Sequence, residues 1–458
     1  METPPVKIGL EVHGYIDVSK KLFCNCDVDH EAQSNTTVCP RCTGQPGNKP
    51  MATNAHAMRK ALSIALMLNF KVNTRLLFQR KHYSWPDMPT GFQRTMSGSY
   101  SVPVGEEGNF RGIRIDECHL EEDPARWDPE TGKVDYNRSG YPLIEIVTKP
   151  DFTSAEQVRD WLKHLVTALG YIQAIHKQAG IKSDVNVSIG PKFERVEIKN
   201  VNSLSSIVSA VEYEIERQKQ EVSAGNRIPQ QTRTWSDENG ETIFMRSKET
   251  AQDYMFIPEP DLPAIVIDQE QLQQIAESLP ESPEVKHQKL VAIGIAQEDA
   301  TVLSNEFALI DLFERVAQYV SAALAARWIR REVVRVANYH RLDLDNIPLD
   351  AMQFAHLLKM VEDKIITENV AQKILEKMFE ENIDVRSYVE QEGLAATGDS
   401  EELEKVCDEV ILEQQKAVED YRSGNEKSLH FLIGQVMRKT RGTAQPEAVR
   451  EVFLKILG

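Results

Sequence analysis

The sequence of 458 residues lacks the signatures of several large enzyme classes. It contains no GxxxxGK[ST] loop for nucleotide phosphates, no GxGxxG turn, no HExxH zinc-protease motif and no GxSxG nucleophile elbow. A nucleotide-using enzyme with this sequence would therefore need a less common phosphate site. Cysteine or serine nucleophilic chemistry has no support either, since Cys118 and Cys407 each stand alone and are expected to be inert core thiols.

Long apolar runs and a secretion signal are also missing. No stretch approaches the roughly 20 apolar residues that span a bilayer. The N-terminus, METPPVKIGLEV, has no basic segment followed by an apolar one. We therefore expect a cytoplasmic protein without a membrane partner, whose thiols are reduced or bound to metal.

Positive charge is scarce, with 53 Lys and Arg against 70 Asp and Glu and a formal net charge of −17. This balance argues against a protein that covers nucleic acid with its whole surface, because phosphate contacts need Lys and Arg. A local basic face is still compatible with it. Residues 421–458 hold seven Lys or Arg and three Glu, although a solvated basic helix surface explains that stretch equally well.

Four of the six cysteines lie within residues 24–42, in the stretch FCNCDVDHEAQSNTTVCPRC. They form two close pairs, Cys24 with Cys26 and Cys39 with Cys42. Two such pairs joined by a loop bring four thiolates to one tetrahedral zinc. The pairing favours zinc, with two disulfides or four ordinary thiols as the alternatives.

The first 285 residues or so mix strand and helix patterns. Apolar and polar residues alternate with the period of a half-buried strand in residues 7–16, 184–189 and 195–199, and residues 142–147 are apolar on both faces except for Glu145. Helices are expected from a capping box at Thr153-Ser154-Ala155-Glu156 to Gly170, and over about 205–223.

Beyond residue 280 the strand patterns disappear. Residues 351–361 and 367–380 have apolar residues at helical spacing, and a stretch of small and acidic residues at 392–404 precedes a last helical segment. The sequence predicts an α+β protein with three parts: a mixed domain at 1–286, an all-helical domain at 287–402 and a small helical tail at 403–458.

The mixed domain places carboxylates on strands where a purely structural role explains them poorly. Burying an unpaired carboxylate such as that of Glu145 costs several kcal/mol unless a cation meets it. Carboxylates gathered with one histidine are the hard ligands that suit Mg²⁺, which commonly pairs with substrate phosphates. The candidates are Glu11, His13, Glu145, Asp184, Glu197 and the run Glu121-Glu122-Asp123. For any one of them, a solvent-facing strand position is the alternative.

Long motifs of this sequence resemble the B subunit of the tRNA-dependent amidotransferases, the GatB part of the GatCAB complex. They appear in the family's order and cover nearly the whole chain: IGLEVH (8–13), the cysteine pairs, QRKHYSWPDMPTGFQ (79–93), HLEEDP (119–124), VDYNRSGYPLIEIVTKPD (134–151), RVEIKNVNS (195–203), MRSKETAQDY (245–254), PEPDLP (258–263) and FLIGQVMRKTRGTAQP (431–446). The related E-type subunit carries an inserted domain for which this sequence has no room.

The resemblance implies an ATP-dependent reaction on tRNA mischarged with Asp or Glu. GatB phosphorylates the side-chain carboxylate, and ammonia from glutamine then displaces the phosphate to give Asn-tRNA or Gln-tRNA. Matched motif by motif, the family's Mg²⁺ and nucleotide-site groups fall on Glu11, His13, Glu122, Glu145, Asp184 and Glu197, and a lysine near the reaction centre falls on Lys81.

The resemblance also implies partners and a layout. The partners are the glutaminase and the small third subunit of the same amidotransferase, the mischarged tRNA and a non-discriminating synthetase. The layout is a catalytic cradle domain built on an antiparallel sheet, a helical domain and a tRNA-binding tail. We expect tRNA contacts from Arg327, Arg330, Arg331, Arg438, Lys439 and Arg441.

Two other functions stay open on the sequence: a zinc-bearing tRNA-binding adaptor without chemistry, and a Mg²⁺-dependent phosphotransferase on a small acid. In each case the cysteine cluster is expected to hold structural zinc, because four thiolates fill the zinc coordination sphere and leave no position for a substrate.

Overall fold

The structure is a computed structural model, and it describes residues 5–176, 181–190, 192, 194–201, 203–247, 254–396, 400–440 and 442–457. The chain forms two compact units, Met1–Ser282 and Pro283–Gly458. No helix in these described ranges combines the length and the apolar character needed to cross a membrane.

In its described residues, the first unit contains the β-strands and four α-helices. The strands are β1 (Val6–Tyr15), β2 (Lys71–Val72), β3 (Arg75–Leu76), β4 (Gln79–His82), β5 (Phe92–Thr95), β6 (Gly105–Phe110), β7 (Ile113–Glu122), β8 (Arg126–Trp127), β9 (Val134–Asp135), β10 (Pro142–Thr148), β11 (Ile181–Ile189), β12 (Val196–Val201), β13 (Gln231–Ser236), β14 (Glu241–Ser247), β15 (Met255–Pro258) and β16 (Ile265–Val266). The helices are α1 (Ala55–Met67), α2 (Ala155–Tyr171), α3 (Leu204–Ser223) and α4 (Gln269–Ser278).

A twelve-stranded sheet organises this unit, in the order β14-β13-β12-β11-β1-β10-β7-β5-β4-β15, with β6 paired to β7 and β2 to β6. The sheet is antiparallel except for β12 and β13, which run parallel and are connected through α3. A parallel pair needs such a crossover, because a tight hairpin reverses the chain. The expected antiparallel sheet therefore differs from the structure in this one pair.

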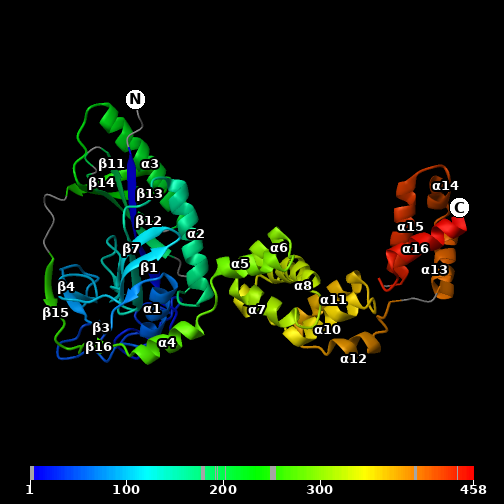
Figure 1. Cartoon of the computed structure of the whole chain (residues 1–458), viewed down its shortest axis with the longest axis horizontal. Helices are drawn as coiled ribbons and strands as arrows, with labels where there is room; N and C mark the ends of the chain where they lie inside the picture. Colours follow the sequence, from blue (N-terminus) through cyan, green and yellow to red (C-terminus); the bar gives the residue numbers. More distant parts are fainter. Residues whose placement is uncertain are drawn as a thin grey trace. The chain divides into compact units, whose positions relative to one another are not determined.

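Helices cover one face of the sheet and enclose the core. Figure 1 shows α2 and α3 side by side along the sheet, where α3 contacts β11, β12 and β14. The strands contribute Leu10, Val12, Leu120, Ile144, Ile146, Val185 and Ile198 to this core, all at most 1% exposed. Each fully buried side chain of this size contributes about 1.5–3 kcal/mol, so the strand alternation fixes which face meets the helices.

The two helices predicted in the first unit are present with small shifts. In α2 the N-cap is Ser154, whose side chain accepts from the backbone N–H of Gln157, while the Gln157 side chain accepts from Thr153. The N-cap is therefore one residue later than predicted, and the Gln157 side chain bonds to Thr153 instead of to the N–H of the N-cap, so the reciprocal capping box is not formed. The helix also continues through Gly170 and ends at Tyr171.

The regular secondary structure in the described residues of the second unit is helical, as predicted. Its helices are α5 (Pro283–Ala292), α6 (Gln297–Asn305), α7 (Phe307–Val316), α8 (Ala322–Trp328), the π-helix η2 (Ile329–Val333), α9 (Val334–Tyr339), the 3₁₀ helix η3 (Leu344–Asn346), α10 (Ala351–Glu362), α11 (Glu368–Glu380), α12 (Val385–Gln391), α13 (Ser400–Glu413), α14 (Gln415–Arg422), α15 (Glu426–Lys439) and α16 (Pro446–Leu457). Helices α13–α16 enclose an apolar core of their own, which includes Leu403, Leu432 and Phe453.

Candidate active site and metal centres

The face of the sheet opposite the helix-covered core carries titratable side chains on neighbouring strands. His13 of β1 lies opposite Glu145 of β10, and Glu145 lies opposite His119 of β7. On the other side of β1, Glu11 lies opposite Asp184 of β11. Directly opposed residues of antiparallel strands project from the same face. The register therefore gathers residues that are far apart in the sequence.

The first cluster consists of His13, Glu121 and Glu145, whose ligand atoms all lie within 4.8 Å of one another. Nε2 of His13 is 3.4 Å from Oε2 of Glu145. The same oxygen lies 3.1 Å from Nε2 of His119, which is itself 3.9 Å from Oε2 of Glu121. The carboxylates of Glu121 and Glu145 thus converge with the imidazole of His13, and the imidazole of His119 contacts both carboxylates.

Mutual pairing sets the pKa values in this cluster. Burial by itself would raise the pKa of Glu145, but His119 and His13 outweigh burial and hold that pKa well below its usual value. Burial would lower the pKa of His13, but Glu145 raises it to about 9. Burial likewise opposes charge on His119, and Glu145, Glu117 and Glu121 still raise its pKa. Without a metal, the histidines are the cations that stabilise the carboxylates.

The second cluster consists of Glu11, Asp184 and Glu197, again with ligand atoms within 4.8 Å of one another. Nζ of Lys199 donates to Oδ2 of Asp184 at 2.6 Å and lies 3.4 Å from Oε1 of Glu197. Nδ2 of Asn186 donates to Glu11 at 3.1 Å. Burial raises the pKa of Glu11, and the neighbouring carboxylate of Glu145 adds to this effect. Three carboxylates therefore converge beside Lys199, and together they form a candidate cation site.

Glu122 and Lys81 lie elsewhere. The carboxylate of Glu122 accepts from the backbone N–H of Arg94 at 3.0 Å and from its guanidinium at 3.1 Å, and among the described residues Glu122 belongs to neither cluster. Lys81 lies on β4, with Nζ 4.7 Å from the centre of the Tyr254 ring. The structure brings together the other five predicted residues of the oxygen-ligand set and places Glu121 beside them.

Strand parity explains why Glu121 takes this position. Leu120 packs in the apolar core, and alternate residues of a strand project to opposite faces. His119 and Glu121 therefore project to the polar face, whereas Glu122 does not. The alternation of His119, Leu120 and Glu121 is visible in the sequence, so the same period that identified the other strands could have distinguished Glu121 from Glu122 within the predicted run Glu121-Glu122-Asp123.

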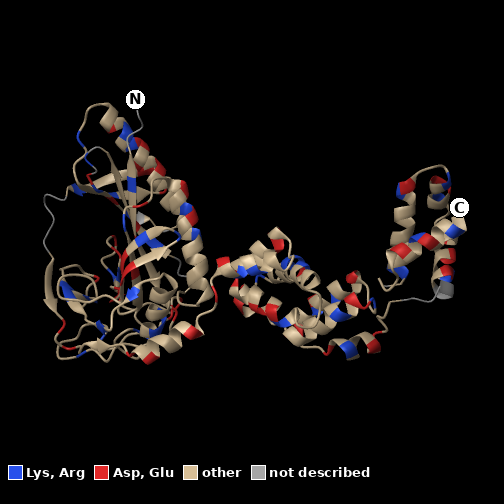
Figure 2. Cartoon of the chain, viewed as in Figure 1, with Lys and Arg blue, Asp and Glu red and all other residues tan. Residues whose placement is uncertain are grey.

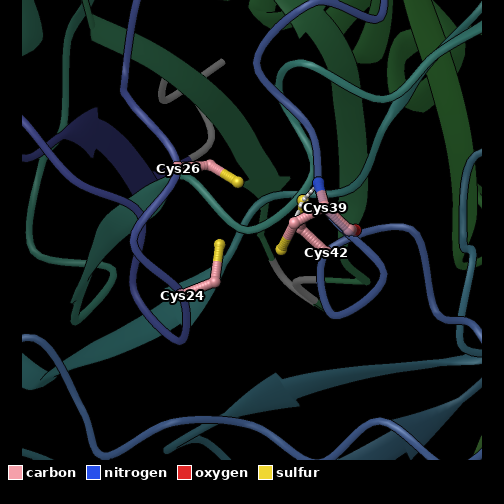
Figure 3. Close-up of side chains that lie close together, drawn as sticks. All are labelled: Cys24, Cys26, Cys39 and Cys42. Carbon is pink, nitrogen blue, oxygen red and sulfur yellow. Dashed lines mark hydrogen bonds between the residues drawn. The ribbon is translucent and has the colours of Figure 1, made fainter.

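The four cysteines form a separate cluster in the loop after β1. Figure 3 shows the sulfurs of Cys24, Cys26, Cys39 and Cys42 turned toward one another, and the four lie within 4.8 Å. All four are free thiols, and Sγ of Cys39 and Sγ of Cys42 are 3.9 Å apart. The set could hold a metal ion, and convergence of four sulfurs fits tetrahedral zinc.

The local environment favours negative charge on Cys42. Its Sγ accepts from the backbone N–H of Cys39 at 3.2 Å and from Nζ of Lys21 at 3.5 Å. A hydrogen bond with Cys24, followed by these contacts, lowers the pKa of Cys42 to about 5 against the opposing effect of burial. A thiolate is the form of cysteine that binds metal. The low pKa of Cys42 therefore favours the form that can act as a metal ligand.

The cysteine loop is attached to the segment that leads into β10. Ser139 Oγ donates to the carbonyl of Cys42 at 2.7 Å, and the backbone N–H of Leu22 donates to Gly140 at 2.9 Å. Gly44 has φ +66°, and a Cβ there would lie 2.5 Å from the carbonyl oxygen of Pro89. Only glycine permits this close approach. The two hydrogen bonds hold the backbone of the cysteine loop next to residues 139 and 140, which directly precede β10, the strand that carries Glu145.

The basic residues of the second unit are largely paired with acids. Arg327 pairs with Glu368 at 2.8 Å, and Arg330 pairs with Asp299. Lys439 bridges Glu409 and Glu413 at 2.9 and 2.7 Å. Figure 2 shows the two signs of charge mixed along these helices. Arg331 and Arg438 are exposed, and Arg441 lies outside the described residues.

Comparison with known proteins places this fold and site in a defined class. Residues 6–273 match the family model described as the GatB/GatE catalytic domain, and residues 311–457 match the GatB domain. The sheet with its carboxylate clusters is therefore the catalytic domain of the GatB/GatE class.

The relatives identify the branch of that class. A protein of Methanocaldococcus jannaschii, named as the B subunit of aspartyl/glutamyl-tRNA(Asn/Gln) amidotransferase, is 42% identical over 99% of this chain and 98% of that protein. Proteins with the same name from Methanothermobacter thermautotrophicus and Methanopyrus kandleri are also 42% identical, each over 98% of this chain. The chain belongs to the GatB family of amidotransferase B subunits.

Proposed function

We propose that this chain activates the side-chain carboxylate of Asp or Glu on mischarged tRNA with ATP and transfers ammonia to it. The observation that carries the proposal is the pair of adjoining carboxylate clusters, His13 with Glu121 and Glu145, and Glu11 with Asp184 and Glu197. The sequence of a GatB-family catalytic domain supports the same reaction.

The residues of both clusters fit Mg²⁺. Their donors are carboxylate oxygens and imidazole, and oxygen donors are the ligands this ion prefers. In the second cluster, three carboxylates, those of Glu11, Asp184 and Glu197, lie close together, and the described Lys199 contacts two of them, Asp184 and Glu197. When bound, Mg²⁺ would neutralise the γ-phosphate of ATP and the substrate carboxylate at the point where they meet.

The chemistry explains why the chain supplies positioned charge rather than a nucleophile. An oxygen of the substrate carboxylate attacks the γ-phosphorus, the bond to the bridging oxygen breaks, and ADP leaves. Ammonia then attacks the acyl carbon, phosphate leaves with the electron pair of the carbon–oxygen bond, and the nitrogen gives up one proton to form the amide. The carboxylates on this sheet face hold charge and orientation for these steps, and Lys199 holds the carboxylate of Asp184 in place through a hydrogen bond of 2.6 Å.

The proposal includes partners and a structural metal. Ammonia would come from the glutaminase of a complex that also contains a small third subunit. The tRNA would arrive directly or from a non-discriminating synthetase. Cys24, Cys26, Cys39 and Cys42 would hold Zn²⁺, which would stabilise the loop beside the sheet. No open coordination position would remain there, so the zinc would take no part in the reaction.

The test uses the reconstituted complex with ammonium chloride in place of glutamine, so that glutaminase activity does not enter the result. Glu145→Gln and Asp184→Asn should each lower ADP formation stimulated by mischarged tRNA by about 10²–10³-fold, as loss of one positioned charge does elsewhere. The matched control is Glu130→Gln, because Glu130 is exposed on the same unit, and it should keep full activity.

Two results would overturn the proposal. If both variants keep wild-type ATP hydrolysis and only bind tRNA more weakly, the chain is a zinc-bearing adaptor without chemistry. If the wild-type chain phosphorylates a free acid and tRNA has no effect on the rate, it is a phosphotransferase acting on small molecules.

A further inference from the structure

His119 is a buried residue of the polar sheet face that the proposed metal set does not include. It lies in the middle of β7, opposite Glu145 of β10, and its side chain is 1% exposed. Its neighbours in the strand, Cys118 and Leu120, pack into the apolar core on the other face. A histidine enclosed to this degree cannot turn toward solvent, so its two ring nitrogens can interact only with the protein groups around them.

Both ring nitrogens of His119 face carboxylate oxygens. Nε2 lies 3.1 Å from Oε2 of Glu145, and Nδ1 lies 3.2 Å from Oε1 of Glu117. Oε1 of Glu117 also accepts from Oγ of Ser97 at 2.7 Å. A continuous row of contacts therefore runs from Ser97 through Glu117 and His119 to Glu145, and Glu145 in turn lies 3.4 Å from His13.

This geometry separates His119 from the candidate ligands. A carboxylate oxygen lies within 3.2 Å of each ring nitrogen, although neither contact has the geometry of a hydrogen bond. With Glu145 at one nitrogen and Glu117 at the other, the ring is suited to hold carboxylates in place. The candidate metal-binding group of the described residues contains His13, Glu121 and Glu145, without His119.

We propose that His119, itself held by Glu117, is a positioning residue that orients the carboxylate of Glu145 toward His13 and Glu121 and thereby sets the affinity of this cluster for a divalent cation. The inference rests on the proposed Mg²⁺ site. Groups that orient a ligating side chain commonly change metal affinity by about 10–100-fold when removed. Glu117 acts one contact further away, so its removal should have a smaller effect.

The test measures Mn²⁺ binding to the assembled complex by electron paramagnetic resonance, together with thermal unfolding in EDTA. His119→Leu should raise the Mn²⁺ dissociation constant by about 10–100-fold. His119→Gln retains a donor and should recover part of the loss, while Glu117→Gln should weaken binding by less than about tenfold. The control His56→Gln, at an exposed position of α1, should bind Mn²⁺ as the wild type does.

The variants distinguish a positioning role from a packing role. If His119→Gln and Glu117→Gln fold but bind Mn²⁺ with the wild-type constant, the inference is wrong, even where unfolding in EDTA shifts. These two variants also decide the question if His119→Leu fails to fold.

Glu145→Gln separates this inference from the proposed function. Wild-type binding in Glu145→Gln would refute the metal site itself. Loss of binding in Glu145→Gln with unchanged binding in the His119 and Glu117 variants would refute only the positioning role.

Discussion

The cysteine cluster of the first unit, here called the sulfur centre, and its two adjoining carboxylate clusters, together called the oxygen centre, are built in opposite ways. The sulfur centre takes its four ligands, Cys24 to Cys42, from one loop after β1. The oxygen centre takes its ligands from β1, β7, β10, β11 and β12, and the segments between them include whole helices. One centre therefore depends on the conformation of a loop, and the other on the register of a sheet.

This difference predicts what each centre tolerates. A shift of one residue in strand pairing moves every side chain to the opposite face, which would turn Glu145 or Glu11 into the helix-covered core. The cysteine loop has no such register, but it loses its shape if one thiolate is removed. Changes in the loop should therefore affect folding, and changes on the sheet face should affect chemistry.

The largest expected effect is on stability, from Cys42→Ser. Loss of a structural metal belongs to the few single changes that exceed about 4 kcal/mol, so the free energy of unfolding should fall by that order. Zinc content, measured by mass spectrometry, should fall close to zero. Tryptophan fluorescence in urea gives the stability, and ATP hydrolysis per folded molecule should stay near the wild-type value.

The matched control is Cys407→Ala, which removes a buried thiol from α13, outside the cluster. It should leave zinc content unchanged. A Cys42→Ser protein that is folded and zinc-free but inactive would show that the two centres are not separable.

Glu121→Gln compared with Glu122→Gln should give the next largest effect. Glu121 lies in the first cluster and Glu122 lies against Arg94. Loss of the first charge should lower tRNA-stimulated ATP hydrolysis by about 10²–10³-fold with little change in stability. Glu122→Gln should mainly destabilise the fold, because it leaves Arg94 with fewer acidic partners in a buried position. If Glu122→Gln instead loses ATP hydrolysis and Glu121→Gln keeps it, Glu122 and not Glu121 is the metal ligand.

These neighbours also show what the sequence can and cannot predict. Cys24 to Cys42 were predictable as a set, because their ligands come in two local pairs. Glu11, His13, Glu145, Asp184 and Glu197 were each predictable as polar residues on strands. Their convergence was not, since no pattern within one strand states which strands are neighbours. The choice between Glu121 and Glu122 depended on strand parity, which the family motif HLEEDP does not show by itself.

The same distinction between local patterns and long-range contacts applies to the fold. The strand periods and the helical second half were predictable, because side-chain burial has a period along each element. The parallel pairing of β12 with β13 and the contact of the cysteine loop with residues 139 and 140 connect distant segments. Such long-range pairings are decided by tertiary packing. The local residue patterns of a single sequence therefore do not predict them.

A low pH should stabilise the metal-free oxygen centre but weaken its binding of Mg²⁺. Without metal, Glu145 raises the pKa of His13 to about 9, above an unfolded value near 6.5. The resulting stability, up to about 3 kcal/mol, is complete below pH 6.5 and is lost as the pH rises through about 9. Metal binding requires neutral His13, so Mg²⁺ affinity should rise over the same interval.

The measurement is urea unfolding between pH 6.5 and 9.5, in EDTA and in excess Mg²⁺. The midpoint should fall with pH in EDTA and fall less in Mg²⁺. His13→Gln should remove this difference between the two conditions, whereas Cys42→Ser should retain it. Equal slopes for the wild type in EDTA and Mg²⁺ would contradict binding at His13.

The smallest effect is expected far from both centres, in α15. Arg438 is exposed, whereas Lys439 is bridged to Glu409 and Glu413. Arg438→Glu should therefore weaken tRNA binding a few-fold and lower the salt slope of the affinity by about 1. Lys439→Glu should change tRNA binding less and should instead destabilise α13–α16, because it places three acids together. Filter binding at several salt concentrations measures both, and zinc content and Mn²⁺ affinity should be unchanged. Equal tRNA affinity in Arg438→Glu and wild type would remove this residue from the RNA surface, and the exposed Arg331 would be tested next.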